Sequence, residues 1–427
     1  MSVENVFSRS PDHEIPPIVT PILYNIQKKK KGISTITLEK PLGKGGYGTV
    51  YLCRDENDQE LAVKCIKAKD FGIPSLIEAS IMSVIHHPNI NKAIKIHSSP
   101  QKLYIVQELA ISDLRVYRLN NSNIPNDLIY RWIHDIAQGI NCLHKYDIIH
   151  GDLKASNILV YPDNIIKITD FTLSTDKKWK NDYRPCTPTH RPLEVWLGDK
   201  WNMSVDIWSF GCTIFEMIYG KTLFINQGRD PSINALLDWY NYLPSTYRSD
   251  DFHITRRDCF HYTFTLSSSF NISNPLDRLM LSMLAIDPTK RPKIDTILKH
   301  ELFRTYPTVP SMIVSNPITT LTPKSTSKVR KHLGDILSNN YTIDLAYDLY
   351  TRVTGMINAN DKLKMITCAW IANKITEREN ISSKLNRIIP FELHEILQME
   401  RSICNYLSYR LYCKPTQVIF RESKQQG

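Results

Sequence analysis

The sequence of 427 residues predicts an α+β protein in which β-type patterning comes first, helical patterning follows, and a small all-α domain comes at the end. Three observations predict this architecture. Short runs of β type begin at Ile33 and continue to about Leu109. Helical patterning begins at Pro125 and dominates to about Phe303. A Pro-, Thr- and Ser-rich stretch from Pro307 to Ser327 then precedes four or five further helical patterns.

The composition allows two or three domains with buried cores, since 42% of the residues are hydrophobic and 22% are charged. A net charge of +10 and a pI near 9.0 suit nucleic acid, membrane surfaces or acidic partners. The Lys and Arg residues are dispersed along the chain, however, and enzymes that handle phosphate are often basic. We therefore expect neither a nucleic acid nor a membrane partner.

Nine cysteines show no metal-ligand spacing, and Cys142, Cys212 and Cys368 lie inside apolar runs. This pattern is typical of reduced core residues in an intracellular protein. The first 20 residues lack the apolar core of a signal peptide. The most apolar run, Ile207 to Tyr219, is shorter than the ~20 residues of a membrane span. We expect a soluble intracellular protein, with cytoplasm, nucleus and, for a viral protein, host cell or virion left open.

The stretch from Ile149 to Val160 reads I-H-G-D-L-K-A-S-N-I-L-V and carries the most chemistry. Asp152 follows one apolar pair, and Asp170 follows a second short strand-like run. Lys154 and Asn157 lie between these two carboxylates. One carboxylate can accept the proton of a hydroxyl while the other and the Asn hold a metal, so the pattern predicts a Mg²⁺-phosphate site.

This stretch resembles the H-R-D-L-x-x-x-N and D-F-G signatures of the protein kinases. The resemblance implies a bilobal fold with an antiparallel β-sheet N-lobe and a helical C-lobe, followed here by the small all-α domain. The resemblance implies that Asp152 accepts the proton of the substrate hydroxyl and that Lys154 neutralises the γ-phosphate of ATP. It also implies that Asn157 and Asp170 bind Mg²⁺. The form D-L-K-x-x-N, with Lys154, is similar to the Ser/Thr rather than the Tyr kinases.

A glycine loop, G-K-G-G-Y-G, lies between strands around Leu38 and Val50. It resembles the hairpin over the ATP phosphates in kinases rather than a Rossmann turn, which would open a helix. A Cβ would keep the loop's N–H groups from closing over phosphates. The residues expected to bind ATP here are Leu42, Gly43, Lys44, Gly45, Gly46, Tyr47, Gly48, Thr49 and Val50.

The strand Leu61 to Ile66 places Ala62, Lys64 and Ile66 on one face, so Lys64 needs a buried partner. Glu78 lies on the apolar stripe of the next helix. The two resemble the Lys–Glu pair of the kinase β3 strand and αC helix, although a purely structural ion pair is the alternative. The strings I-P-S-L-I-E and H-H-P-N-I also look like the αC region of cyclin-dependent kinases.

The remaining ATP contacts are implied by the same resemblance. Gln107 falls at the gatekeeper position, Glu108 to Ala110 would offer hinge backbone to adenine, and Asp113 would reach the ribose. Ala62 and Leu159 complete the expected ATP-binding set.

The segment from Asp170 to Glu194 aligns with the kinase activation segment. The resemblance predicts that Glu194 pairs with Arg291 and that Asp206 holds the backbone of the catalytic loop. The variable stretch from Thr222 to Phe270 is expected to bind either a substrate or a partner, and its sequence does not indicate which.

The sequence departs from the kinase pattern at two positions. Gly151 replaces the Arg that binds the activation-loop phosphate, and Asp182 stands near the phosphosite register. Both indicate a kinase that does not need activation-loop phosphorylation. Thr172 replaces the Gly of D-F-G, and we expect it to be forced to φ > 0 at a cost of roughly 1–2 kcal/mol.

The C-terminal helices carry two charges on apolar faces. Lys374 shares a face with Leu363, Ile366 and Trp370, and Glu400 lies within the stripe from Leu393 to Leu407. The pattern predicts a buried Lys374–Glu400 pair. Another stripe comprises Leu345, Leu349, Val353 and Met356, and residues 361–375 are apolar nearly all round, as in a central buried helix.

The strings around these two charges resemble the first cyclin box, where such a Lys and Glu help form the kinase-binding surface; the alternative is a generic helical domain. We expect a flexible tail at 1–32, a kinase domain at 33–303, a linker at 304–330, a cyclin-like domain at 331–414 and a tail at 415–427. The Lys run from Lys28 to Lys31 suits a solvated linker better than a nuclear import signal.

Together these patterns predict a Ser/Thr protein kinase that uses ATP and Mg²⁺, acts on protein hydroxyls and is activated in cis by its cyclin-like domain. The alternative is a catalytically weak pseudokinase or adaptor whose cyclin-like box recruits another kinase. The substrate and the compartment are not indicated.

Overall fold

The computed structural model describes residues 37–46, 48–67, 72–99, 101–121, 123–175, 185–224, 273–307, 312–313, 323–356, 360–376 and 391–411. The predicted tails, Tyr47, Asp182 and nearly all of the variable stretch after Thr222 lie outside these residues.

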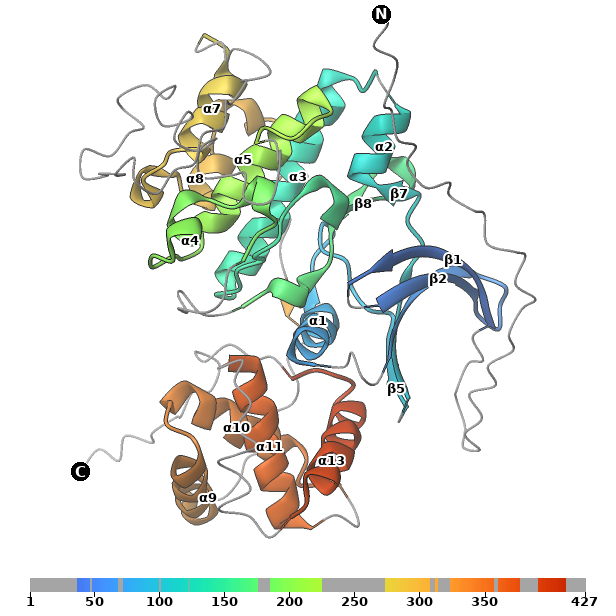
Figure 1. The fold of residues 1–427 in the computed structure, drawn as a ribbon, viewed down its shortest axis with the longest axis vertical. Helices are drawn as coiled ribbons and strands as arrows, with labels where there is room; N and C mark the ends of the chain where they lie inside the picture. Colours follow the sequence, from blue (N-terminus) through green and yellow to red (C-terminus); the bar gives the residue numbers. More distant parts are fainter. Residues whose placement is uncertain are drawn as a thin grey trace, which may run out of the picture.

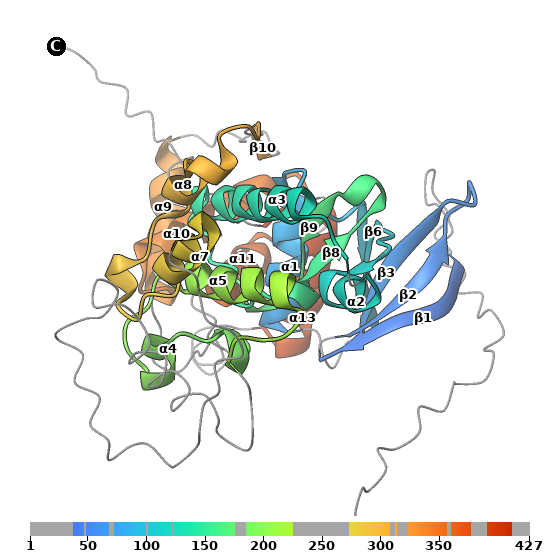
Figure 2. The same ribbon diagram turned by 90° about the horizontal axis from the view of Figure 1, so that it is seen from above.

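The N-terminal lobe is built on a five-stranded antiparallel sheet with the order β1-β2-β3-β6-β5 (Figure 1). Its strands are β1 (Thr37–Gly45), β2 (Gly48–Arg54), β3 (Glu60–Lys67), β5 (Lys95–Ser98) and β6 (Lys102–Glu108). Helix α1 (Ile73–Val84) has a proline in its first turn, where a missing N–H costs nothing. Nearly every residue of α1 is buried, because the sheet lies on one side and other helices lie on the others (Figure 2).

The helical lobe is organised by two buried helices, α3 (Asn126–Lys145) and α5 (Ser204–Tyr219). The apolar stripe of α3 faces the core, whereas α5 is buried nearly all round. Around them lie α2 (Leu114–Asn120), α4 (Leu193–Leu197), α7 (Pro275–Met283) and α8 (Ile294–Leu298), with 3₁₀ turns η3 (Pro162–Asn164), η8 (Pro288–Lys290) and η9 (Glu301–Phe303).

A small antiparallel sheet at the junction of the lobes carries the predicted chemistry. Its strands are β7 (Ser112–Asp113), β8 (Ile158–Val160) and β9 (Ile166–Ile168), in that order. The turn η2 (Ala155–Asn157) precedes β8, η4 (Phe171–Leu173) follows β9, and η5 (Pro188–His190) lies further along the chain. This arrangement brings the stretches around Asp152 and Asp170 to one end of the sheet.

Residues after 313 form a helical body of α9 (Pro323–Ile336), α10 (Asn340–Arg352), α11 (Asp361–Thr376) and α13 (Leu393–Tyr406), which lies beside α1 in Figure 1. Helix α11 is buried along nearly all of its length from Leu363 to Thr376, as predicted for a central helix. The predicted linker at 304–330 includes regular structure. The strand β10 (Met312–Ile313) pairs with β4 (Ile85–His86), which directly follows α1, and α9 already begins at Pro323.

The predicted Lys374–Glu400 pair is present. Lys374 Nζ lies 2.9 Å from both Glu400 oxygens, and the Lys and Glu side chains are 15% and 2% exposed. Trp370 Nε1 donates a third hydrogen bond to Glu400 at 3.1 Å. Neither charged side chain hydrogen-bonds to the described part of residues 37–313, so the pair lies inside the helical body rather than across the interface.

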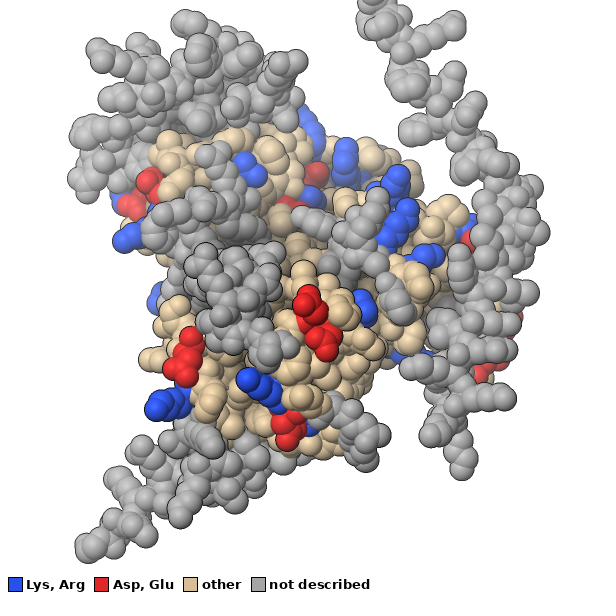
Figure 3. Space-filling model, turned by 60° about the horizontal axis from the view of Figure 1, so that its bottom comes forward, with Lys and Arg blue, Asp and Glu red and all other residues tan. Residues whose placement is uncertain are grey.

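The described surface agrees with the expectation of dispersed charge. Figure 3 shows Lys and Arg at several separate places on one face, some of them beside Asp or Glu. The cysteines in the described residues are buried and form no disulfide with one another, and they include Cys142, Cys212 and Cys368. None of the described helices is long and apolar enough to cross a membrane.

Candidate active site

The centre of the site is a partly buried lysine between two carboxylates. Lys64 Nζ lies 2.6 Å and 2.7 Å from the Glu78 oxygens and 3.8 Å from Asp170 Oδ1. Burial raises the pKa of Glu78, and the negative charge of Asp170 adds to this, while Lys64 opposes both. Helix α1 packs against η4, so the helix that carries Glu78 is held next to the turn that follows Asp170. The predicted pairing of strand and helix is therefore formed.

Asp152 is the most heavily hydrogen-bonded carboxylate of the site. Its Oδ2 accepts from Lys154 Nζ at 2.8 Å and from Asn157 Nδ2 at 3.1 Å. Its Oδ1 accepts from both the backbone N–H and the hydroxyl of Thr187, at 2.8 Å and 2.7 Å. Lys154 Nζ also donates to Thr187 Oγ1 at 2.7 Å. These bonds fix the carboxylate in one orientation.

The prediction for Thr172 is wrong. The left-handed residue of this turn is Asp170, with φ 63° and ψ 74°, whereas Thr172 lies inside the 3₁₀ turn η4 without a positive φ. Thr172 Oγ1 donates to Asp170 Oδ1 at 2.7 Å. Burial alone would raise the pKa of Asp170, but Lys64 and the Thr172 hydroxyl hold it below the ordinary value. The threonine therefore supports the ionised carboxylate.

The backbone before Asp152 is held by a buried carboxylate from α5. Asp206 Oδ2 accepts from His150 N at 2.8 Å, and its Oδ1 accepts from Gly151 N at 2.9 Å. Burial alone would raise the pKa of Asp206, but the hydrogen bond and charge of His144 and the N–H of Gly151 keep it below the ordinary value. The predicted support of this loop by Asp206 is present.

A second predicted support joins the end of the activation segment to the base of the lobe. Arg291 and Glu194 form a bidentate pair with N–O distances of 2.6 Å and 2.9 Å, and both side chains are nearly inaccessible. Two parallel charge-assisted bonds fix both position and angle.

Both the backbone conformation and the close packing at position 151 favour a glycine. Its φ is +75°, and a Cβ at this position would lie 2.8 Å from the carbonyl oxygen of Leu173. Its own carbonyl accepts from Cys186 N at 2.5 Å, which joins the loop to the end of the activation segment. An arginine cannot replace this glycine without moving the loop.

The glycine loop over the expected nucleotide position is a β1–β2 hairpin, as predicted. A Cβ on Gly48 would lie 2.7 Å from the carbonyl oxygen of Cys65, so packing on β3 explains this glycine. A Cβ on Gly43 or Gly46 would meet no atom within 4 Å, and neither residue needs to be glycine for the fold. Their role remains the predicted one toward phosphate. Lys44, Gly45 and Thr49 lie in the same paired strands.

The other expected nucleotide contacts line up along the sheet and the hinge. Val50 pairs in register with Lys64, Ala62 pairs with Gln107, and Leu159 lies in β8. Leu42 is half exposed. The Glu108 side chain pairs with Lys167, which leaves the backbone from Glu108 to Ala110 as the hinge. Asp113 caps α2 by accepting from Val116 N at 2.9 Å, so one of its carboxylate oxygens is already engaged.

Behind the nucleotide position lies a polar network that the sequence did not indicate. Asn91 Nδ2 donates to Gln107 Oε1 at 2.9 Å and to Thr169 Oγ1 at 3.1 Å. Tyr161 donates its hydroxyl to Asn91 Oδ1 at 3.3 Å. The network joins the gatekeeper position to the residue that precedes Asp170.

The donor set fits a hard divalent cation. Asn157 Nδ2 donates to the carbonyl of Asp152 at 2.8 Å and to its carboxylate. The amide oxygen of Asn157, Oδ1, therefore points away from these bonds. Asp170 supplies an ionised carboxylate. Carboxylate and amide oxygens are ligands that Mg²⁺ accepts alongside phosphate oxygens and water.

Comparison with known proteins agrees with this geometry. A family model described as Protein kinase domain matches residues 36–303. Cell division control protein 2 homolog 3 of Trypanosoma brucei brucei is 35% identical over 193 residues, which is 43% of this chain and 62% of that protein. The chain belongs to the protein kinase family.

Thr187 contacts the carboxylate of Asp152, and the sequence did not single it out for these contacts. Thr187 is 35 positions from Asp152 along the chain, and it makes two hydrogen bonds to that carboxylate. A lone hydroxyl in a Thr- and Pro-rich segment carries no local pattern. The signal that could have drawn attention to it is its place shortly before the aligned Pro192–Glu194 of the kinase activation segment.

Proposed function

We propose that the protein is a Ser/Thr protein kinase that transfers the γ-phosphate of ATP to protein hydroxyls. The observation that carries the proposal is the position of Lys64, in ion-pair contact with Glu78 and 3.8 Å from Asp170. When bound, ATP supplies the phosphoryl group and Mg²⁺ spreads charge off its oxygens. Asn157 and Asp170 would hold the metal, and Lys64 would face the phosphates.

Asp152 would orient the acceptor hydroxyl and take its proton. The hydrogen bonds from Thr187 and Asn157 fix the position of the Asp152 carboxylate. Lys154 Nζ lies 2.8 Å from the same carboxylate, and from there its positive charge can also stabilise the phosphoryl group during transfer. The lysine in D-L-K and its bond to Thr187 support Ser/Thr acceptors.

The test is a phosphotransfer assay on Ser, Thr and Tyr peptide libraries. Asp152→Asn should lower kcat by roughly 10²–10⁴-fold, because the general base is lost while the hydrogen-bonding shape is kept. Asp163→Asn, an exposed change in the turn η3, is the matched control. Equal rates for wild type and Asp152→Asn would instead support a scaffold without catalysis.

We also infer that activity does not require phosphorylation of the activation segment. The end of that segment is held by groups that need no phosphate: Gly151 O accepts from Cys186 N, and Arg191 donates to the carbonyls of Pro185 and Cys186 at 3.0 Å and 2.7 Å. These bonds adjoin Thr187, which contacts Asp152. Phosphatase-treated enzyme should keep its turnover, and loss of turnover on phosphate removal would contradict the inference.

The helical body after residue 313 is proposed to be a cyclin-like domain that activates the kinase domain in cis. Three contacts support this. Helix α11 packs against α1, which carries Glu78. Asn405 on α13 accepts from Ser98 N and Ser98 Oγ at 3.3 Å and 3.2 Å and donates to Ser98 O at 3.4 Å. The strand β10, which comes shortly before the helical body in the chain, pairs with β4 at the end of α1.

A tether makes such docking intramolecular, with an effective concentration in the mM range for a short flexible linker. The helical body would then hold α1 in place and keep the Lys64–Glu78 pair closed. Interface variants in the full chain test this proposal, and one of them is described in the Discussion.

A further inference from the structure

Thr172 takes the position of the glycine in the D-F-G signature, and its hydroxyl makes a contact that a glycine cannot make. Thr172 Oγ1 donates to Asp170 Oδ1 at 2.7 Å. The threonine is 2% exposed and lies inside the turn η4, which packs against α1. The hydroxyl is therefore held by the packing of the turn, and it is shielded from water that would compete for the carboxylate.

This bond distinguishes the two carboxylate oxygens of Asp170. Oδ1 accepts from Thr172 and lies 3.8 Å from Lys64 Nζ. Oδ2 makes no hydrogen bond or ion pair within the part of the chain that the structure describes. The Asp170 side chain is 34% exposed, so an ion can reach it from solvent. Oδ2 is therefore the oxygen that is available to a cation.

The backbone directly before Asp170 is fixed by other groups. Thr169 N donates to the carbonyl of Asn157 at 2.9 Å, and Thr169 O accepts from His150 Nε2 at 3.0 Å. Asp170 itself has a left-handed φ of 63°, a conformation that aspartate adopts more readily when its side chain hydrogen-bonds locally. The freedom that these contacts leave is the rotation of the Asp170 carboxylate, and the Thr172 hydroxyl restricts that rotation.

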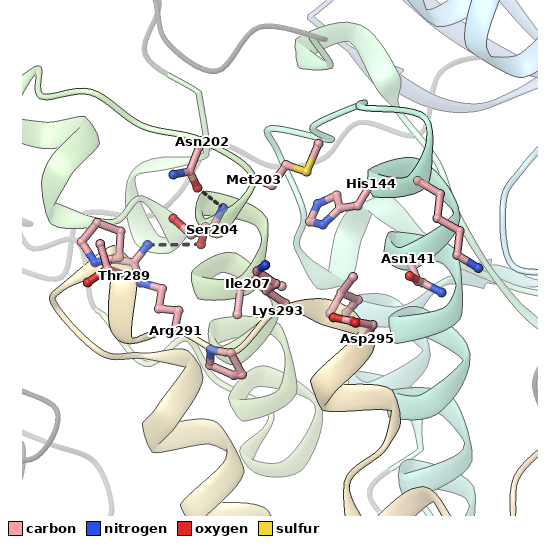
Figure 4. A pocket seen from close by; sticks show the side chains of 14 residues that line it. Asn141, His144, Asn202, Met203, Ser204, Ile207, Thr289, Arg291, Lys293 and Asp295 are labelled. Carbon is pink, nitrogen blue, oxygen red and sulfur yellow. Dashed lines mark hydrogen bonds between the residues drawn. The ribbon is translucent and has the colours of Figure 1, made fainter. Parts of the chain in front are cut away.

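Buried polar side chains elsewhere in the kinase domain join segments of the chain. His144 and Arg291, which line a pocket at the base of the helical lobe (Figure 4), are bonded to Asp206 and Glu194. Neither of these two carboxylates is an expected metal ligand. Thr172 differs, because its one side-chain bond within the described residues ends on a carboxylate that the proposed function assigns to Mg²⁺.

We propose that Thr172 is a positioning residue for metal binding: its hydroxyl holds Asp170 Oδ1 and thereby presents Oδ2 to a divalent cation. The inference rests on the proposed kinase function, which assigns Asp170 to Mg²⁺. A group that hydrogen-bonds to a metal ligand typically changes metal affinity by about 10–100-fold. If the Thr172 bond served the fold alone, its loss would lower stability and leave metal affinity unchanged, so the two roles differ in a measurable way.

The test measures how much a metal ion improves nucleotide binding, without any turnover. The full chain is titrated in a calorimeter with the non-hydrolysable analogue adenylyl imidodiphosphate, once with Mn²⁺ and once with a chelator. Thr172→Val removes the hydroxyl and keeps the shape of the side chain. It should reduce the Mn²⁺-dependent gain in affinity about tenfold or more and leave the metal-free affinity unchanged.

Two further variants isolate the hydroxyl. Thr172→Ser keeps it and should retain the wild-type gain. Thr213→Val removes a buried hydroxyl that bonds only to the backbone of α5, at Ser209 O, and should also retain the gain. An undiminished gain in Thr172→Val, or an equal loss in Thr172→Val and Thr172→Ser, would overturn the positioning role.

Asp170→Asn separates this inference from the proposed function. It should remove most of the Mn²⁺-dependent gain, because it removes the charge of the ligand. If Asp170→Asn lost the gain while Thr172→Val kept it, only the positioning role would be wrong. If Asp170→Asn and wild type showed equal gains, the assignment of Asp170 to Mg²⁺ would be wrong as well.

Peptide phosphorylation gives a second measurement. In Thr172→Val, the Mg²⁺ concentration for half-maximal rate should rise about tenfold or more, while kcat at saturating Mg²⁺ is kept. A lower kcat with an unchanged Mg²⁺ dependence would contradict the positioning role. A wild-type chain without turnover would contradict the proposed function, and the calorimetric titration would still decide the role of Thr172.

Discussion

Two buried Lys–Glu pairs, one in each part of the molecule, have nearly the same geometry and different surroundings. In both pairs the lysine side chain is 15% exposed and the glutamate 2% exposed. The N–O distances are 2.6 Å and 2.7 Å for Lys64–Glu78 and 2.9 Å for both contacts of Lys374–Glu400. Burial and distance alone therefore do not separate a catalytic pair from a structural one.

The difference lies in the third group. Lys64 has a second carboxylate, Asp170, at 3.8 Å and lies under the hairpin expected to cover phosphates. Glu400 has the Trp370 indole N–H as its third partner, and Lys374 lies over the same ring at 4.9 Å from its centroid. The Lys64–Glu78 pair therefore lies beside a second carboxylate that is available to a ligand. The third partner of the Lys374–Glu400 pair is an aromatic side chain instead. Four predictions use this contrast.

The largest effect is expected on stability, from Lys374→Met. Removing one partner of a buried pair typically costs ~3–5 kcal/mol, because Glu400 is left charged and buried. Hydrogen exchange of the α11 and α13 amides and thermal unfolding both measure the loss. The double variant Lys374→Met with Glu400→Gln should recover most of it, since a glutamine oxygen still accepts from Trp370. A single variant as stable as wild type would show that this pair does not support the helical body.

Lys64→Met is expected to affect turnover instead. Loss of a preorganised charged donor typically lowers kcat by roughly 10²–10³-fold, or about 2.7–4 kcal/mol. Peptide phosphorylation at saturating ATP measures this effect. Lys67→Met, an exposed change at the end of the same strand, is the matched control. If Lys64→Met and Lys67→Met had similar kcat values, Lys64–Glu78 would be a structural pair like Lys374–Glu400.

Asn405→Ala tests whether the part that contains Lys374–Glu400 acts on the part that contains Lys64–Glu78. It leaves the partly buried N–H and C=O of Ser98 without their partner, which costs about 1–3 kcal/mol of docking. We expect faster hydrogen exchange in α1 and lower kcat. Ser402→Ala is the control, because its hydroxyl bonds only within α13, to Gln398 O. Unchanged exchange in α1 would contradict activation in cis.

The sequence was sufficient for both pairs because each charge interrupts an apolar stripe of regular period. Lys64 falls on the inner face of a strand and Glu78 on the inner stripe of a helix, so each needed a partner. The same reasoning located Lys374 and Glu400. The family resemblance then added Asp206 and the Glu194–Arg291 pair, which the structure contains.

Features that depend on tertiary contacts could not be predicted from the periodicity of the sequence. The positive φ of this turn belongs to Asp170 and not to Thr172, because the fold of the turn decides which residue takes it. The 2.8 Å approach of a Gly151 Cβ to Leu173 O joins segments that only the folded loop brings together. The pairing of β10 with β4 likewise places part of a Pro- and Thr-rich stretch in a sheet, although its composition predicts a linker.

The smallest effect is expected from pH, and it concerns the Lys64–Glu78 pair. Burial raises the pKa of Glu78, so as pH falls this carboxylate takes up its proton earlier than an ordinary glutamate and releases Lys64. We expect kcat/KM for ATP to fall on the acid side by about tenfold per pH unit. Because the folded state binds this proton more tightly than the unfolded state, protonation of Glu78 does not itself unfold the protein.

Asp206 should affect the stability of the fold in the direction opposite to Glu78. The pKa of Asp206 is lowered, so the stabilisation it provides is present above the pKa it has in the unfolded chain and is lost as pH falls through the folded value. Activity should therefore decline at a higher pH than the fold, as measured by kinetics and circular dichroism on the same samples. Glu78→Gln should remove this acid limb from its residual activity. If activity and fold were lost at the same pH, the loss of activity in acid would reflect unfolding and not the protonation of Glu78.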